Sequence, residues 1–81
     1  MAKSSYVCVM RFRDSNMPKM RQDENTESLA FATIDSWSKR FAAISSLAIY
    51  TPQGSKLCFD PMGNYVFTVP PESCKALNLK P

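Results

Sequence analysis

Arginine and lysine side chains are the residues of this sequence that best support a binding function. Arg11 and Arg13 stand at alternate positions near the end of Ser4–Arg13, a segment rich in β-branched and aromatic residues that predicts a strand. Alternate residues of a strand share a face, so both arginines are expected on the face turned away from the core. The expected partner-binding residues are Arg11, Arg13, Lys19, Met20, Arg21, Tyr50 and Lys56.

Two kinds of partner fit these residues. A basic sheet face that carries an aromatic side chain can bind nucleic acid through phosphate contacts and base stacking, although Tyr50 is the one aromatic expected there. A protein is the alternative, because flexible thioether side chains suit protein contacts and Met17, Met20 and Met62 stand near Pro or Gly in expected loops. The methionines can instead cap the ends of the sheet, and the arginines can simply keep an exposed face soluble.

Catalysis is not expected from these residue types. The chain has no histidine, which removes the usual general base and the Ser–His and Cys–His nucleophile pairs. Asp23, Glu24 and Glu27 are the one carboxylate cluster, and such a cluster is typical of a solvated helix N-terminus. The protein is therefore expected to be no enzyme and to need no cofactor or metal.

The cysteines do not indicate a metal site or a disulfide framework. Three residues at wide spacing, without a Cys-x-x-Cys motif, are typical of reduced thiols, with Cys8 and Cys58 as small core residues. If Cys8 and Cys58 stood on neighbouring strands, they could also form a disulfide. Reduced thiols favour a cytoplasmic location.

The segment Thr26–Ala43 is the one with clear helical periodicity. Its apolar residues recur at three- and four-residue spacing around Ile34 and include Ala30, Phe31, Trp37 and Phe41. Asn25 or Thr26 is expected to cap the start, and Ser45 and Ser46 are expected to mark the exit. This amphipathic helix is expected to pack against the apolar face of Ser4–Arg13, with Trp37 and Phe41 as its main anchors.

Short β-like segments surround the helix. Met17–Gln22 is expected as a weak edge strand, because Pro18 lacks an N–H, with a loop as the alternative. Three further segments separated by Pro- and Gly-containing turns predict an antiparallel meander: Leu47–Thr51, Lys56–Asp60 and Tyr65–Val69. Residues 70–81 are expected as a short helical turn or tail with a frayed end. The expected fold is a single α+β domain over residues 1–81, with an antiparallel sheet of four or five strands and one helix on one face.

Charge is unevenly distributed along the chain. Residues 1–21 carry a net charge of +4, residues 22–38 carry −4, and residues 39–81 carry +3. Segregated charge on a small domain favours a protein partner over simple polyanion binding. No segment approaches the length of a membrane span, so no membrane partner is expected.

The predicted layout resembles a family of small phage-encoded proteins. The features that carry the resemblance are the Glu27-Ser28-Leu29 opening of the helix and the spacing from the helix to the following hairpin. On these features the chain is similar to anti-CRISPR proteins, specifically the inhibitors of type I surveillance complexes. The resemblance implies one helix on an antiparallel sheet and a non-enzymatic inhibitor that binds a CRISPR effector subunit. It assigns no functional residues.

Three functions remain open at this point. The leading expectation is a small binding protein that inhibits a host protein or ribonucleoprotein complex by occupying its surface. The second is a nucleic-acid-binding module that uses the basic sheet face. The third is a minor subunit of a larger assembly, attached through an exposed strand edge.

Overall fold

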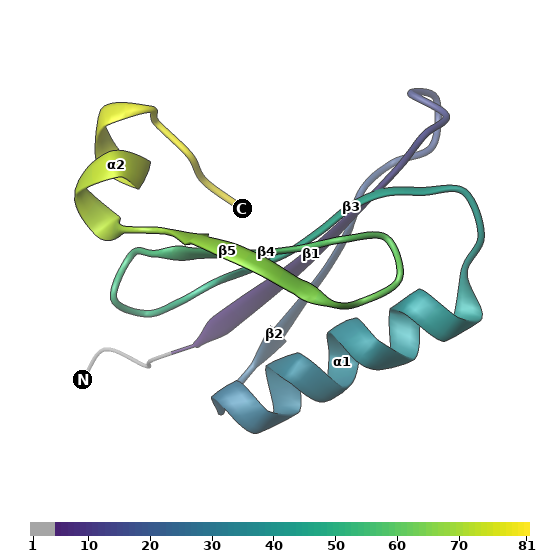
Figure 1. Ribbon diagram of the computed structural model, residues 1–81, viewed down its shortest axis with the longest axis horizontal. Coiled ribbons are helices and arrows are strands. Elements are labelled where there is room, and N and C mark those ends of the chain that lie inside the picture. The colour runs from purple at the N-terminus through teal and green to yellow at the C-terminus, as the bar shows by residue number, and fades with distance from the viewer. Residues whose placement is uncertain (1–4) are drawn as a thin grey trace.

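The protein folds as one five-stranded antiparallel sheet with a long helix on one face (Figure 1). The computed structural model describes residues 5–81, so Ser4, the first residue of the expected first strand, lies outside the described residues. The elements are β1 Tyr6–Phe12, β2 Met20–Glu24, α1 Glu27–Arg40, β3 Ile44–Tyr50, β4 Lys56–Phe59, β5 Tyr65–Val69 and α2 Pro71–Ala76. The α+β class, the antiparallel sheet and the single main helix are confirmed.

The strand order β2-β1-β3-β4-β5 joins an N-terminal hairpin to a C-terminal meander. The junction is the pairing of β1 with β3, in which Cys8 lies opposite Ile49 and Met10 lies opposite Leu47. Residues directly opposite one another share a face, so these four apolar side chains point to the same side of the sheet. That side is the one covered by α1.

The core lies between the sheet and α1, which packs on β1, β2 and β3. Ile34 and Trp37 of α1 are 1% and 4% exposed. The other buried members of the cluster are Cys8, Met10, Ala30, Ile44, Leu47, Ile49 and Phe59. Trp37 is therefore an anchor as expected, whereas Phe41 is only half-buried, and Phe31 remains 39% exposed although its ring packs edge-on against Phe59.

The helix ends three residues earlier than its periodicity predicts. Thr26 caps the start, where its Oγ1 accepts a hydrogen bond of 3.2 Å from the N–H of Leu29. Phe41 is already extended, and the carbonyl oxygen of Ala43 accepts a 2.9 Å hydrogen bond from the N–H of Arg13. Ala43 pairs with the end of β1 instead of continuing the helix, so the predicted helix end at Ala43 was wrong.

The early helix end lengthens the next strand. β3 begins at Ile44, so Ser45 and Ser46 belong to the strand instead of marking a loop. Ser46 lies opposite Arg11, which shows that the β1 ladder extends over this polar segment. The predicted exit at these two serines was wrong, because serine carries little signal of its own and the neighbouring strand decides its conformation.

The second strand is real but displaced along the sequence. β2 covers Met20–Glu24, whereas the predicted segment began at Met17 and ended at Gln22. The register pairs Met10 with Met20 and Tyr6 with Glu24. Pro18 lies before the strand and not within it, which agrees with its missing N–H.

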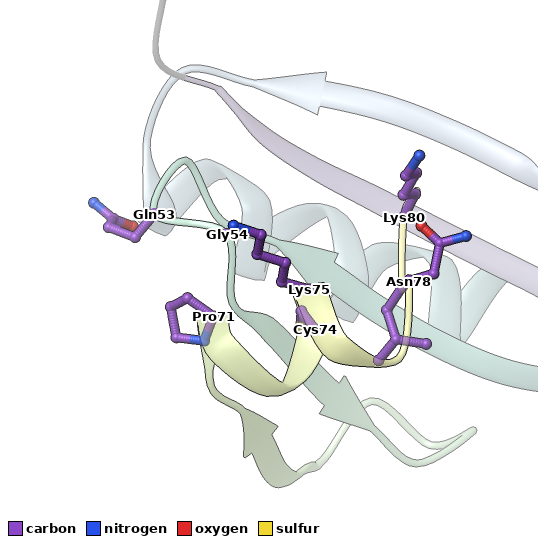
Figure 2. Close-up of a pocket in the computed structure, with 8 residues that line it drawn as sticks. Gln53, Gly54, Pro71, Cys74, Lys75, Asn78 and Lys80 are labelled. Atoms are coloured by element: carbon purple, nitrogen blue, oxygen red, sulfur yellow. The ribbon is translucent and has the colours of Figure 1, made fainter.

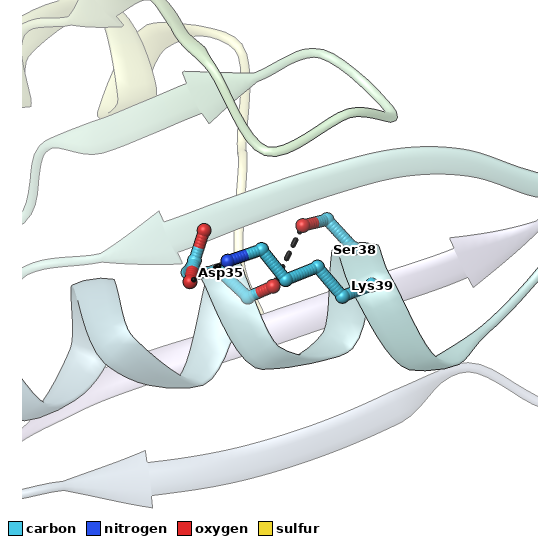
Figure 3. A network of polar contacts seen from close by, with 3 residues as sticks. All are labelled: Asp35, Ser38 and Lys39. Carbon is cyan, nitrogen blue, oxygen red and sulfur yellow. Dashed lines mark hydrogen bonds and ion pairs between the residues drawn. The ribbon is translucent and has the colours of Figure 1, made fainter.

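The outer face of α1 is polar. Lys39 Nζ lies 3.0 Å from Asp35 Oδ2, and Ser38 Oγ donates a 2.7 Å hydrogen bond to the carbonyl oxygen of Asp35 (Figure 3). The lysine and aspartate side chains are largely exposed, so their ion pair stabilises the helix by only a few tenths of a kcal/mol, about 0.3–0.5 kcal/mol.

A second, smaller layer lies on the other side of the sheet, where α2 and the C-terminal residues fold back (Figure 1). Val7, Val9 and Ala48, which point to that side, are 8%, 4% and 6% exposed. The N–H of Leu79 donates a 2.9 Å hydrogen bond to the carbonyl oxygen of Cys74, and the Leu79 side chain is half-buried. The expectations of a frayed C-terminus and of an open sheet face at these positions were therefore wrong.

Candidate functional site

The predicted basic residues lie on or beside the face of the sheet opposite α1. Val7 lies opposite Tyr50, Tyr50 lies opposite Lys56, and Arg11 is four residues further along β1 than Val7. Side chains four apart on a strand share a face, so Arg11, Tyr50 and Lys56 point to the same side. Arg21, opposite Val9, points there too.

These residues do not form one continuous basic surface. Arg11 lies about 13 Å along β1 from the position of Tyr50, and the buried side chains of Val9 and Ala48 lie between. Two of the basic groups also have local partners. Arg21 Nε lies 3.1 Å from Asp23 Oδ1, and Lys56 Nζ lies 5.6 Å from the centre of the Tyr50 ring. The face is thus divided into a Tyr50–Lys56 end and an opposite end.

At the opposite end, exposed cations gather around the β1–β2 hairpin. Arg11 and Lys19 each stand one residue beyond the Met10–Met20 pair, so they flank the hairpin at the same level. Arg13 follows β1, and its backbone is held by the hydrogen bond to Ala43. All three side chains are exposed. We call this region, together with the pocket described next, the hairpin end.

An apolar pocket of about 530 Å³ opens at the hairpin end. Its lining comes from the β1–β2 loop and from the segment between α1 and β3: Phe12, Asp14, Met17, Pro18, Met20, Phe41, Ala42 and Ala43. The Phe12 and Phe41 rings pack edge to face with centroids 6.1 Å apart, and the Arg40 guanidinium lies 5.5 Å from the centre of the Phe41 ring. The volume is in the range that accommodates a drug-sized ligand or a large side chain.

The one charged residue in the pocket lining is directed to its own turn. Asp14 Oδ1 accepts a 2.9 Å hydrogen bond from the N–H of Asn16. The pocket can therefore receive an apolar group, and Arg11, Arg13 and Lys19, which stand next to lining residues in the chain, can attract negative charge to the same end of the sheet. This combination suits a partner surface that carries both.

The sequence predicted only part of this site. Met20 was expected as a site residue in a loop, but it is half-buried at the start of β2 and forms one wall of the pocket. Phe41, Ala42 and Ala43 were assigned to the helix, so their role in the pocket was missed. Met17 and Pro18 were the available signal, since exposed apolar residues in a short loop invite a contact.

A second pocket, of about 370 Å³, lies between the β3–β4 turn and α2. Figure 2 shows that its polar side chains diverge: Gln53 extends to one side, while Asn78 and Lys80 lie on the other. The sulfur of Cys74, also in the lining, donates to the carbonyl oxygen of Val69 at 3.5 Å. We assign no binding role to this pocket.

The cysteines lie on different faces of the sheet. Cys8 points to α1, Cys58 points to the opposite side, and β3 separates their strands, so the conditional Cys8–Cys58 disulfide is not formed. Cys58 is half-buried and lies outside the core cluster, unlike Cys8. Burial raises the pKa of the Cys8 thiol to about 12, and the carboxylates of Glu24 and Asp23 add to the effect. Burial also raises the pKa of Cys58, against the opposing effect of Lys56.

Within residues 5–81, no group of three His, Cys, Asp or Glu side chains is placed to hold a metal ion. None of the helices described there has the length and apolar character needed to cross a bilayer.

Comparisons with protein-family models, curated proteins and solved structures found no match to this chain.

Proposed function

We propose that this protein is a binding protein that occupies the surface of a partner protein with its hairpin end. The observation that carries the proposal is an apolar pocket at the same end of the sheet as the exposed cations Arg11, Arg13 and Lys19, each of which stands next to a pocket-lining residue in the chain. Protein interfaces commonly place an apolar anchor in a central pocket and polar contacts around it. The partner surface is then acidic and presents a large apolar side chain to the pocket.

The two parts of the site contribute differently. Insertion of an apolar side chain between Phe12, Met20 and Phe41 supplies most of the affinity, because it removes apolar surface from water. The exposed cations mainly accelerate association and select an acidic partner, since they lie in water and are screened by salt.

In the form implied by the anti-CRISPR resemblance, the partner is a subunit of a type I CRISPR surveillance complex. Inhibition then follows from occupation of a surface that the complex needs, and it requires no catalytic group. Two observations support a protein partner over nucleic acid. The buried side chains of Val9 and Ala48 divide the basic face. In addition, Arg21 is paired with Asp23, and Lys56 lies over the Tyr50 ring.

The proposal is tested by affinity capture from a bacterial lysate that contains a type I CRISPR system. The bait is the parent protein, an Arg13→Glu/Lys19→Glu variant, or a Lys75→Glu/Lys80→Glu control with the same change in charge away from the hairpin end. The parent and the control should retain one protein at stoichiometric level after nuclease treatment, and the hairpin variant should retain at least about tenfold less.

Two results would overturn the proposal. Equal capture by the hairpin variant would remove the hairpin end as the site. Loss of all capture on nuclease treatment would assign the basic residues to nucleic-acid binding instead. Interference against a plasmid target, measured with each variant expressed, reports whether the captured partner is the surveillance complex.

A further inference from the structure

The two edges of the sheet differ in a way that the hairpin end does not explain. β2, at one edge, carries Arg21, Asp23 and Glu24 among its five residues, and charged side chains discourage the addition of another strand. β5, at the other edge, reads Tyr-Val-Phe-Thr-Val. No charged residue occurs anywhere from Pro61 to Pro71. The β5 edge thus has no charged side chain to oppose an added strand.

Apolar side chains of β5 are exposed on both sides of this edge. Tyr65, Val66 and Phe67 are 54%, 55% and 52% exposed, and no residue of β5 is buried. Tyr65 points to the α1 side, where its ring packs edge-on against Phe59. Phe67 points to the other side, opposite Cys58. The helix α1 packs mainly on β1, β2 and β3 and reaches the ring of Phe59 on β4 through Phe31, so β5 lies at the margin of the layer that it covers (Figure 1).

The strand has a regular half and an irregular half. The register between β4 and β5 shifts between Cys58 and Phe59, so Val66 is an extra residue on β5. From Phe67 to Val69 the pairing with β4 is regular. These three residues are the part of the free edge that can continue the sheet.

We infer that β5 pairs antiparallel with β5 of a second copy, about a two-fold axis at Thr68. This register places Thr68 opposite Thr68 of the second copy and Phe67 opposite its Val69. Both are favourable cross-strand pairs, an aromatic with a β-branched residue and a threonine with a threonine. The exposed Tyr65 and Val66 then meet the Pro70–Pro71 segment of the other copy, which is also uncharged.

The register about Thr68 suits a second copy, because it places uncharged residues of β5 opposite one another throughout. Each copy carries a net charge of +3, so association through most of its surface brings like charges together. At β5 the approaching strands carry no charge, and the residues of one strand are suitable cross-strand partners for the same residues of the other. The contact is isologous and closes after two copies. It also leaves the hairpin end free, because β1–β2 lies at the opposite edge of the sheet.

The test measures molar mass by light scattering over a range of protein concentrations. The parent should rise from 9.1 kDa toward twice that value as concentration increases. Thr68→Lys and Thr68→Glu each place two like charges directly opposite at the two-fold axis, so each should weaken dimerisation by about tenfold or more. Thr68 is exposed, and its hydroxyl lies 2.6 Å from the hydroxyl of Tyr65, which is also exposed, so both changes lose this surface hydrogen bond equally and neither disturbs the core. A Gln22→Lys control on β2 should behave as the parent.

Mixing the two charged variants gives a second, sharper outcome. Thr68→Lys with Thr68→Glu should form a one-to-one dimer that neither variant forms alone, because opposite charges then meet at the axis. Amide hydrogen exchange of the parent should also slow with rising concentration at β5 and not at β2. A parent that stays at 9.1 kDa at every concentration would overturn the inference, and so would a dimer that both charged variants retain.

Discussion

The contact between β1 and α1 depends on a buried thiol. Cys8 is 0% exposed, and its sulfur lies 3.6 Å from the carbonyl oxygen of Ala30, which is itself fully buried. Two small side chains at one crossing allow the helix to approach the strand closely. Cys8 therefore acts as a small packing residue, and its thiol is held in the neutral form.

This burial predicts a pH dependence of stability. The Cys8 pKa is about 12 in the folded protein and 9.0 for a free thiol, so the unfolded state loses its proton first as the pH rises. The free energy of unfolding should therefore fall between these two pH values, by at most about 1.4 kcal/mol per pH unit from this group. Urea denaturation from about pH 8 to about pH 11 measures the slope, and Cys8→Ala should reduce it. An unchanged slope in the variant would contradict the assignment.

Among the elements, the turn between β4 and β5 connects the meander to α1. Asp60 Oδ1 accepts 2.9 Å hydrogen bonds from the N–H groups of Met62 and Asn64. The bond from Asn64 is the main cause that holds the pKa of Asp60 below its usual range. Gly63 has φ +88°, and a Cβ at this position would lie 2.7 Å from Ser38 Oγ of α1. The turn therefore packs directly on the helix.

Alanine substitutions at Gly54 and Gly63 distinguish the cost of backbone strain from the cost of the contact with α1. Gly54 has φ +95°, but a Cβ there meets only Pro71 at 3.7 Å, an ordinary contact. Gly54→Ala should thus lose about 1–2 kcal/mol from the left-handed conformation alone. Gly63→Ala carries the same strain and also the clash with Ser38, so its loss in a denaturant titration should be clearly larger. Equal losses would show that the turn moves away from α1 at no cost.

For the whole molecule, the second layer decides how much of the sheet remains open. The side of β1 and β3 that carries Val7, Val9 and Ala48 would be half in water without a covering layer. The α2 segment and the residues after it fold over that side (Figure 1), and Asn78, which follows α2, adopts a left-handed conformation with φ 56°. The covered side chains of Val9 and Ala48 therefore separate Arg11 from Lys56 on this face.

A pair of leucines tests the contribution of this layer. Leu79 is half-buried, whereas Leu77, two residues earlier, is 67% exposed. Leu79→Ala should lower the free energy of unfolding by about 1 kcal/mol, roughly half the value for a fully buried side chain, and Leu77→Ala should change it by less than about 0.5 kcal/mol. Similar melting of both variants and the parent would indicate that the C-terminal residues do not pack on the sheet.

Local patterns predicted most of the elements because their signals are contained within a few residues. The apolar spacing around Ile34 predicted α1, and the alternation of Tyr65–Val69 predicted β5 with the bounds that the structure has. The candidate site was predicted only in part. Arg11, Arg13 and Lys19 are surface cations that composition reveals, whereas the pocket between Met20 and Phe41 is formed by loops far apart in the sequence.

The sequence by itself determined the fold class, the face of β1 that meets the helix and a cap at Asn25 or Thr26, since periodicity and capping depend on neighbouring residues. Only the tertiary structure decided where α1 ends, which face the C-terminal residues cover and which strand edge is left free. Those outcomes depend on pairing between β1 and β3 and on packing of residues distant in the chain. Long-range contacts of this kind override weak local preferences, and they place the pocket and the exposed cations at the same end of the sheet.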